Sequence, residues 1–170
     1  FNFENLEEIW LVPVLFQSHS KIDVPGTMRI EMLNALILDK FKESSIPIKI
    51  SDFETKITKE LSHYQIKLEL ERAFPQNQFV FVIGQEVLHS LSSLKDGTKF
   101  LVTSDFIVYG DKEKLKTLSK NVKLISGLAN TDITSSKIRG MIYRGEDISS
   151  LTSPSVLNYI QEHNLYKKLV

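Results

Sequence analysis

Short apolar runs alternate with longer amphipathic stretches along most of the chain. Between the runs, apolar positions follow helical spacing over Met28–Leu38 and Tyr64–Phe74, and a third helix is expected to close near Gly145. The runs are rich in β-branched or aromatic residues and are only long enough for strands. They span residues 7–14, 46–51, 78–84, 105–110 and 121–126. Because parallel neighbours need a crossover, usually a helix, the alternation predicts an α/β fold with a mainly parallel sheet.

The expected strands are apolar at consecutive positions, which favours burial on both faces by flanking helices. In such sheets, ligands bind at the carboxyl ends of the strands, so this edge is where we expect the chemistry. No internal repeat, low-complexity tract or linker rich in proline, glycine or serine interrupts the pattern. We therefore predict a single domain over residues 1–170.

Composition restricts the partners. Lys and Arg number 21 and Asp and Glu number 21, so no net charge draws the chain towards nucleic acid or an anionic membrane. Any bound anion must be held locally. The absence of cysteine excludes disulfides, thiolate zinc sites and a cysteine nucleophile within the chain. No apolar run is long enough to span a bilayer. We expect a soluble, cytoplasmic protein, and the composition makes no prediction of its oligomeric state.

One polar stretch, TDITSSKIRG, stands out between the last expected strand and a helix. Asp132, Thr134, Ser135 and Ser136 are candidates for the helix N-cap and first turn. Unpaired N–H groups, the positive end of the helix dipole and the hydroxyl groups together also make an anion site. Arg139, one turn further on, can add a cation to the same face. The spacing fits both a simple helix cap and a polyphosphate site.

The same residues carry a family resemblance. ITSSKIR resembles the I-S-S-T-x-I-R signature of the nucleotidyltransferases that adenylate nicotinate or nicotinamide mononucleotide, and SPSVLNYIQEHNLY is similar to the end of those enzymes. The resemblance implies a Rossmann-like nucleotidyltransferase fold with helices on both faces of the sheet. It also implies transfer of AMP from ATP to a pyridine mononucleotide, forming a dinucleotide and pyrophosphate in NAD biosynthesis. Thr134, Ser135, Ser136 and Arg139 would then hold the triphosphate, with Mg²⁺ bridging phosphate oxygens.

A second part of the resemblance lies in FVFVIGQEVLHSL, which resembles the family's strand followed by Gly-x-Asp and a helix. It implies that Gly84 lets the backbone approach the adenosine half of ATP and that the acid accepts hydrogen bonds from ribose hydroxyls. In this chain the acid is Glu86, one methylene longer than aspartate. Taken alone, a glycine at a strand end and an acid at a helix start explain the same residues.

The acceptor side is matched less completely. EEIWLVPV resembles the family's second strand, and FQSHSK then occupies the loop that holds basic residues near the mononucleotide phosphate. The resemblance implies this role for Lys21, with His19 beside it. LSHYQIKLEL stands where the family has Ser-Tyr-Thr near the pyridine substituent, and only Tyr64 agrees with that pattern.

The family's first strand and its H-x-G-H loop, which contacts the ATP phosphates, have no counterpart here. None of the four histidines has another histidine three residues away. We expect this segment upstream of residue 1 and assign no catalytic residue within 1–170. Two alternatives follow from the departures, namely a non-catalytic nucleotide-binding or regulatory module and a sister nucleotidyltransferase with another phosphate-bearing acceptor. A plain α/β protein with a capped helix is a third.

Overall fold

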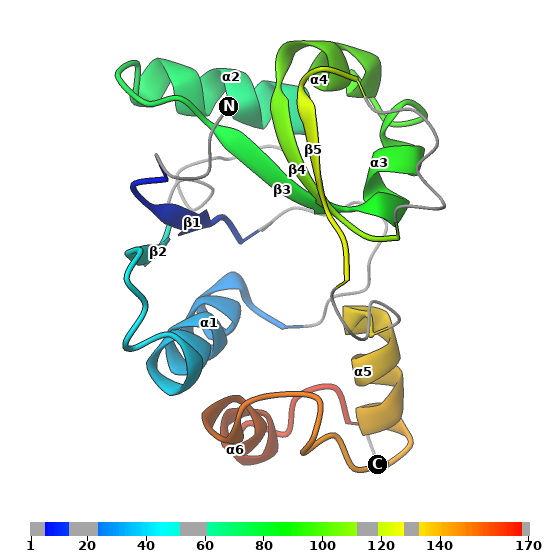
Figure 1. Cartoon of the computed structure of the whole chain (residues 1–170). Coiled ribbons are helices and arrows are strands. Elements are labelled where there is room, and N and C mark those ends of the chain that lie inside the picture. Colours follow the sequence, from blue (N-terminus) through cyan, green and yellow to red (C-terminus); the bar gives the residue numbers. More distant parts are fainter. Residues whose placement is uncertain (1–5, 14–23, 52–60, 112–118, 128–132, 168–170) are drawn as a thin grey trace. The chain divides into compact units, whose positions relative to one another are not determined.

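The computed structural model describes residues 6–13, 24–51, 61–111, 119–127 and 133–167 (Figure 1). Contacts divide the chain into two compact units, one made of Phe1–Glu60 with Ile133–Val170 and the other of Leu61–Asp132. The prediction of one domain over the whole chain stays a prediction.

All five expected strands form, each inside its expected run. The strands are β1 (Ile9–Leu11), β2 (Ile48–Ile50), β3 (Val80–Gly84), β4 (Asp105–Tyr109) and β5 (Val122–Ile125). The helices are α1 (Gly26–Lys40), α2 (His63–Ala73), α3 (Gln85–Leu91), α4 (Gly97–Thr103), α5 (Ser135–Tyr143) and α6 (Pro154–Glu162). Every strand pairing within the described residues is parallel, which confirms the expected sheet type.

The first unit contains the β1–β2 pair and helices α1, α5 and α6. Ile9 lies opposite Ile48 in the pair. The core of the unit is made of apolar side chains from the position two residues before α1, the loop after α5, helix α6 and the turn that follows it. These buried residues are Val24, Ile148, Ile160 and Leu165. The unit is therefore held together by residues from both ends of the chain.

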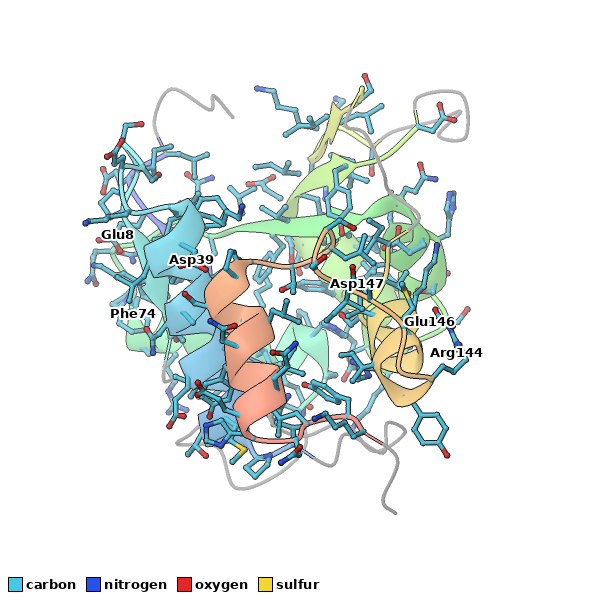
Figure 2. The ribbon with its side chains drawn as sticks, turned by 90° about the horizontal axis from the view of Figure 1, so that it is seen from below. Glu8, Asp39, Phe74, Arg144, Glu146 and Asp147 are labelled. Atoms are coloured by element: carbon cyan, nitrogen blue, oxygen red, sulfur yellow. The ribbon has the colours of Figure 1, made fainter. Side chains whose placement is uncertain are left out.

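Two polar contacts tie α1 to α6. Asp39 accepts hydrogen bonds from the backbone N–H and the hydroxyl of Ser155, at 2.8 and 2.7 Å, and so caps the start of α6. Figure 2 labels Asp39 on α1, beside α6. Nearer the other end of the contact, the Tyr159 hydroxyl donates to Glu31, and this bond raises the pKa of Tyr159 to about 12. These three hydrogen bonds fix how α6 lies along α1.

The second unit is a three-stranded sheet in the order β3–β4–β5, with α2, α3 and α4 around it (Figure 1). Its core gathers Leu91, Phe100, Phe106 and Val108. The Phe100 ring meets Phe106 edge-on, with the ring centroids 5.1 Å apart. Three consecutive β4 residues, from Phe106 to Val108, are buried, so both faces of this strand are covered as its apolar sequence predicted.

Helix α4 was not predicted from the sequence. It begins after Asp96, whose φ of 56° is unusual for a residue other than glycine, and its first residue is the buried Gly97. Its far end is held by Asn121, which donates to the carbonyls of Leu101, at 2.7 Å, and Ser104. The helix depends on a tight backbone approach and on a bond from a distant residue, which local periodicity does not contain.

Across the described residues, no helix reaches the combination of length and apolar character that a bilayer crossing would need. The expected cytoplasmic location stays a prediction.

Candidate functional site

The polar stretch before α5 is a helix start, as predicted. Thr134 is the N-cap, with φ −116° and ψ 156°, and its hydroxyl oxygen accepts a hydrogen bond from the N–H of Lys137 at 3.2 Å. The capping interpretation is therefore correct for Thr134. The N–H groups of Ser135 and Ser136 fall in the part of a helix where no intrahelical acceptor exists. Asp132 lies outside the described residues.

The Arg139 guanidinium is oriented towards the start of α5. A guanidinium nitrogen of Arg139 donates to the Ser136 hydroxyl at 3.1 Å. Ser135 and Ser136 are exposed, and Arg139 is half-buried. Two free backbone donors, two serine hydroxyls and a guanidinium thus meet at the positive end of the helix dipole. Such an arrangement suits a polyphosphate, and it exists alongside the cap rather than instead of it.

The other arginine of α5 lies at the opposite end of the helix. Arg144 is the C-cap and pairs with Glu146, with Nε 2.5 Å from a carboxylate oxygen (Figure 2). The bond to Arg144 holds the pKa of Glu146 below its ordinary value. Arg144 is therefore committed to its own ion pair, and Arg139 is the arginine of α5 that faces the helix start.

Two arginines, Arg139 and Arg29, act on the half-buried Tyr166 phenol. Burial raises the pKa of the Tyr166 phenol, while the guanidinium groups of Arg139 and Arg29 act in the opposite direction. Arg29 belongs to α1, so its proximity to the same phenol as Arg139 comes from the packing of the first unit. The spacing of residues along the sequence does not predict that Arg29 acts on the Tyr166 phenol, although it does show an arginine at the start of α1.

In the second unit, Gly84 and Glu86 come together at the carboxyl end of β3. Gly84 is buried and Glu86 is exposed. A Cβ built on Gly84 would lie 2.2 and 2.5 Å from the carboxylate oxygens of Glu86. The glycine thus leaves the space that the Glu86 side chain occupies. Within the described part of the chain, no hydrogen bond or ion pair engages this carboxylate, which leaves both oxygens available as acceptors.

Gln85, between these two residues, was missed by the sequence analysis. Its side-chain oxygen accepts a hydrogen bond from the N–H of Asp111 at 2.7 Å. A Cβ built on Gly110 would lie 2.3 Å from that oxygen, so the glycine after β4 makes room for the glutamine. The neighbouring parallel strands β3 and β4 thus each have a glycine at their carboxyl end. The Glu86 side chain lies against Gly84, and the Gln85 side chain lies against Gly110.

Tyr64 lies in the first turn of α2 and packs against the core of the second unit. The helix start is fixed by a capping box between Ser62 and Gln65. The Lys99 ammonium lies over the Tyr64 ring, 5.8 Å from its centroid. Its neighbour His63 is packed near Phe100, and burial lowers the pKa of His63. The contact of Tyr64 with a pyridine ring stays a prediction.

The remaining predicted contacts, Lys21 and His19, lie outside the described residues. Among the residues that are described, no group of three or more His, Asp or Glu side chains could hold a metal ion. The two groups of predicted ATP contacts fall in different units, with the α5 start in the first and Gly84 with Glu86 in the second.

Comparison with known proteins gives a consistent result. No family model matches the chain. The probable nicotinate-nucleotide adenylyltransferase of Flavobacterium johnsoniae is 28% identical over 171 residues, which cover 98% of this chain and 86% of that protein. The protein of the same name from Clostridium botulinum is 28% identical over 179 residues, covering 96% of this chain and 86% of its own length. The resemblance read from the motifs is confirmed.

Solved structures agree on the fold. The nicotinic acid mononucleotide adenylyltransferase of Plasmodium falciparum, complexed with NaAD, is 22% identical with a TM-score of 0.80, over 97% of this chain and 85% of that one. The same enzyme complexed with APC gives a TM-score of 0.75 over the same shares. A putative nicotinate-nucleotide adenylyltransferase from Vibrio parahaemolyticus is 18% identical with a TM-score of 0.67, over 96% and 80%. The expected nucleotidyltransferase fold is confirmed.

Proposed function

We propose that this chain transfers AMP from ATP to nicotinate mononucleotide, forming the dinucleotide and releasing pyrophosphate, as a step of NAD biosynthesis. The names of the relatives, at 28% identity over nearly the whole chain, support the reaction class and favour the acid over the amide form of the pyridine. The observation that carries the proposal is the start of α5, where Ser136 and Arg139 are joined at the positive end of a helix dipole.

The reaction needs no covalent enzyme intermediate. An oxygen of the mononucleotide phosphate attacks the α-phosphorus of ATP, a new P–O bond forms, and the bond to the leaving pyrophosphate breaks. Catalysis of such a transfer comes mainly from holding two anions in line and stabilising the charge on the phosphoryl groups. The described residues are accordingly assigned binding roles, and none is assigned as a catalytic acid or base.

The binding roles divide between the two units. Thr134, Ser135, Ser136 and Arg139 hold the triphosphate through N–H groups, hydroxyls and one charge-assisted contact. In the second unit, Gly84 and Glu86 hold the adenosine half. The support for Glu86 is its exposed carboxylate at the carboxyl end of a parallel strand, the edge at which α/β sheets bind ligands.

The acceptor contacts are Lys21 and His19 at the phosphate and Tyr64 at the pyridine ring. The support for Tyr64 is the Lys99 ammonium 5.8 Å from the centroid of its ring, a cation of the kind with which the acid group of nicotinate could pair. ATP and a pyridine mononucleotide are the partners that the proposal implies.

Mg²⁺ would accompany the ATP. The described residues hold no cluster of carboxylates suited to a protein cage for the ion, whereas the α5 start offers hydroxyls beside the predicted triphosphate. The residues that would hold the ion are therefore those that hold the phosphates. When bound, Mg²⁺ neutralises charge on the leaving pyrophosphate.

The triphosphate assignment is tested by removing one cation from each end of α5. Arg139→Ala should weaken ATP binding by about 1.5–3 kcal/mol, a roughly 10- to 150-fold rise in Kd, because it removes a charge-assisted contact. Arg144→Ala is the matched control, since it removes a guanidinium from the same helix at the end away from the predicted phosphates. Isothermal titration calorimetry with ATP measures both. Equal ATP affinity in folded Arg139→Ala and wild-type protein would contradict the assignment.

Turnover is tested on the complete encoded protein, whose first residue is determined by intact mass and N-terminal sequencing. Pyrophosphate release is followed with ATP, Mg²⁺ and either nicotinate or nicotinamide mononucleotide. Release with the nicotinate form is expected. If the protein binds ATP but releases no pyrophosphate with either acceptor, the non-catalytic module replaces the enzyme.

A further inference from the structure

Helix α3 begins directly at the carboxyl end of β3 without a side-chain cap. Its N-cap is Gly84, with φ −75° and ψ 155°, and no side chain accepts a hydrogen bond from the first turn. Most helix starts of this kind are fixed by a capping side chain. Here the direction of the first turn has to be set by other contacts.

Gln85 supplies such a contact by reaching sideways to the neighbouring strand. Its side-chain oxygen accepts from the N–H of Asp111, at 2.7 Å, just beyond the end of β4. The backbone at this point is itself held by β5, because the N–H of Gly110 donates to the carbonyl of Ile125 at 3.1 Å. The first residue of α3, Gln85, is thus hydrogen-bonded to a segment that β5 fixes in place.

Gly110 makes this contact possible. A Cβ at that position would come within 2.3 Å of the Gln85 side-chain oxygen and 2.8 Å of its Cβ and Cδ. No real Cβ tolerates such distances. The glycine after β4 and the glutamine after β3 therefore form one matched pair across the sheet edge.

The Glu86 side chain points back towards β3 instead of towards β4. Its carboxylate lies back over Gly84, in the space that a Cβ on that residue would fill. Consecutive side chains at the start of a helix point in different directions, so fixing the first one restricts the peptide that carries the second. The position of the Glu86 carboxylate depends in this way on the bond made by Gln85.

We infer that Gln85 is a positioning residue that holds the Glu86 carboxylate for the ribose of the nucleotide, an inference that rests on the proposed function. Without the acceptor on Gln85, the start of α3 loses its bond to the end of β4, and Glu86 samples positions away from the sugar. Both carboxylate oxygens of Glu86 can accept hydroxyl donors, because no hydrogen bond or ion pair among the described residues engages them.

The role of Gln85 makes it a determinant of sugar recognition. A site built to bond a hydroxyl discriminates against an analogue that lacks it, because the protein group is then left without a partner. The ratio of kcat/KM for ATP to kcat/KM for 2′-deoxy-ATP or 3′-deoxy-ATP therefore reports how well Glu86 is placed. A residue that only stabilises the fold would leave this ratio unchanged.

The experiment measures pyrophosphate release by the full-length protein with ATP and the two deoxy nucleotides. Gln85→Met keeps the size of the side chain and removes the acceptor, whereas Gln85→Glu keeps an acceptor oxygen and adds a charge that weakens all three nucleotides alike. Gly110→Ala fills the space that the glutamine needs. Thermal denaturation establishes that each variant is folded.

Wild-type protein and Gln85→Glu are expected to prefer ATP over at least one deoxy nucleotide. Gln85→Met and Gly110→Ala should reduce that preference roughly two- to tenfold, the effect of one neutral hydrogen bond. If Gln85→Met does not fold, the ratio in Gly110→Ala decides. An unchanged ratio overturns the inference while the proposed function stands. Turnover without any sugar preference in the wild type also overturns it. A wild type that releases no pyrophosphate contradicts the proposed function itself.

Discussion

The surroundings of two helical glycines, Gly97 and Gly140, predict opposite effects on stability when each is replaced with alanine. Gly97 is the buried first residue of α4 in the second unit, and Gly140 lies in the middle of α5 in the first. Replacing either one with alanine adds a single methyl group. The structure indicates that the methyl destabilises the protein at the first position and stabilises it at the second.

The cost at Gly97 comes from a backbone contact. An added Cβ would lie 1.6 Å from the carbonyl oxygen of Leu91, so the two must separate by at least 1.4 Å to reach the 3.0 Å below which Cβ contacts are essentially not found. The oxygen cannot turn aside freely, because it accepts from the N–H of Leu94 at 3.0 Å and the Leu91 side chain is completely buried. We expect a loss of about 3 kcal/mol or more, at the upper end of overpacking effects.

At Gly140 the added Cβ meets only the end of the flexible Arg144 side chain, at 3.2 Å. Alanine also restricts the unfolded chain and favours helix, so a gain of about 0.5–1 kcal/mol is expected. For a chain of this size 1 kcal/mol corresponds to roughly 2–4 °C in Tm. Gly97→Ala should therefore lower Tm by about 6–12 °C, and Gly140→Ala should raise it by about 1–4 °C.

Thermal unfolding is followed by far-UV circular dichroism, with hydrogen exchange of the β4 amides as a probe of the second unit. The single tryptophan, Trp10, reports on the first unit by fluorescence. Gly97→Ala should increase exchange at Phe106 to Val108. A Tm for Gly97→Ala within 1 °C of the wild type would refute the reasoning, because a 1.4 Å displacement of fixed backbone could not then be costly.

Two further predictions concern polar contacts within each unit. Asn121→Ala should lower the free energy of unfolding by about 1–3 kcal/mol, because it leaves the Leu101 and Ser104 carbonyls unpaired. The control is Asn34→Ala at an exposed position of α1, which should not lower it. Urea denaturation measures both variants, and equal midpoints would contradict the prediction. The bonds from Ser155 hold the pKa of Asp39 below its ordinary value, so its ionised form stabilises the fold above about pH 4 and this contribution is lost as pH falls through the lowered pKa. Urea midpoints of wild type and Asp39→Asn should therefore differ at pH 6 and converge towards pH 2, and a constant difference across this range would be the contrary result.

Much of the fold was readable from local pattern. The five strands and helices α1, α2 and α5 fall where apolar spacing and capping residues predict them, because these signals are short-range, whereas α6 was not predicted. Helix α4 was missed because its start depends on how closely Gly97 approaches Leu91 rather than on periodicity.

In the candidate site, too, only the residues that depend on local sequence were predictable. The α5 start was predictable because a cap, hydroxyls and an arginine one turn apart lie within a single short stretch. Gln85 was not, since its role depends on the N–H of Asp111 and on the absence of a side chain at Gly110. The shared effect of Arg29 and Arg139 on the Tyr166 phenol likewise arises from packing within the first unit, which local sequence spacing does not encode.

The division of the chain into units bears on the order in which the protein can fold during synthesis. The second unit is one continuous stretch, so all of its strands are available as soon as its last residue leaves the ribosome. The first unit is interrupted by it. Asp39 and Glu31 are translated before the second unit, but their partners Ser155 and Tyr159 follow only 116 and 128 residues later, after that unit. Helix α1 therefore gains these contacts only after α6 has been made, and the α5 start that carries the predicted phosphate site joins a closed unit at the same stage.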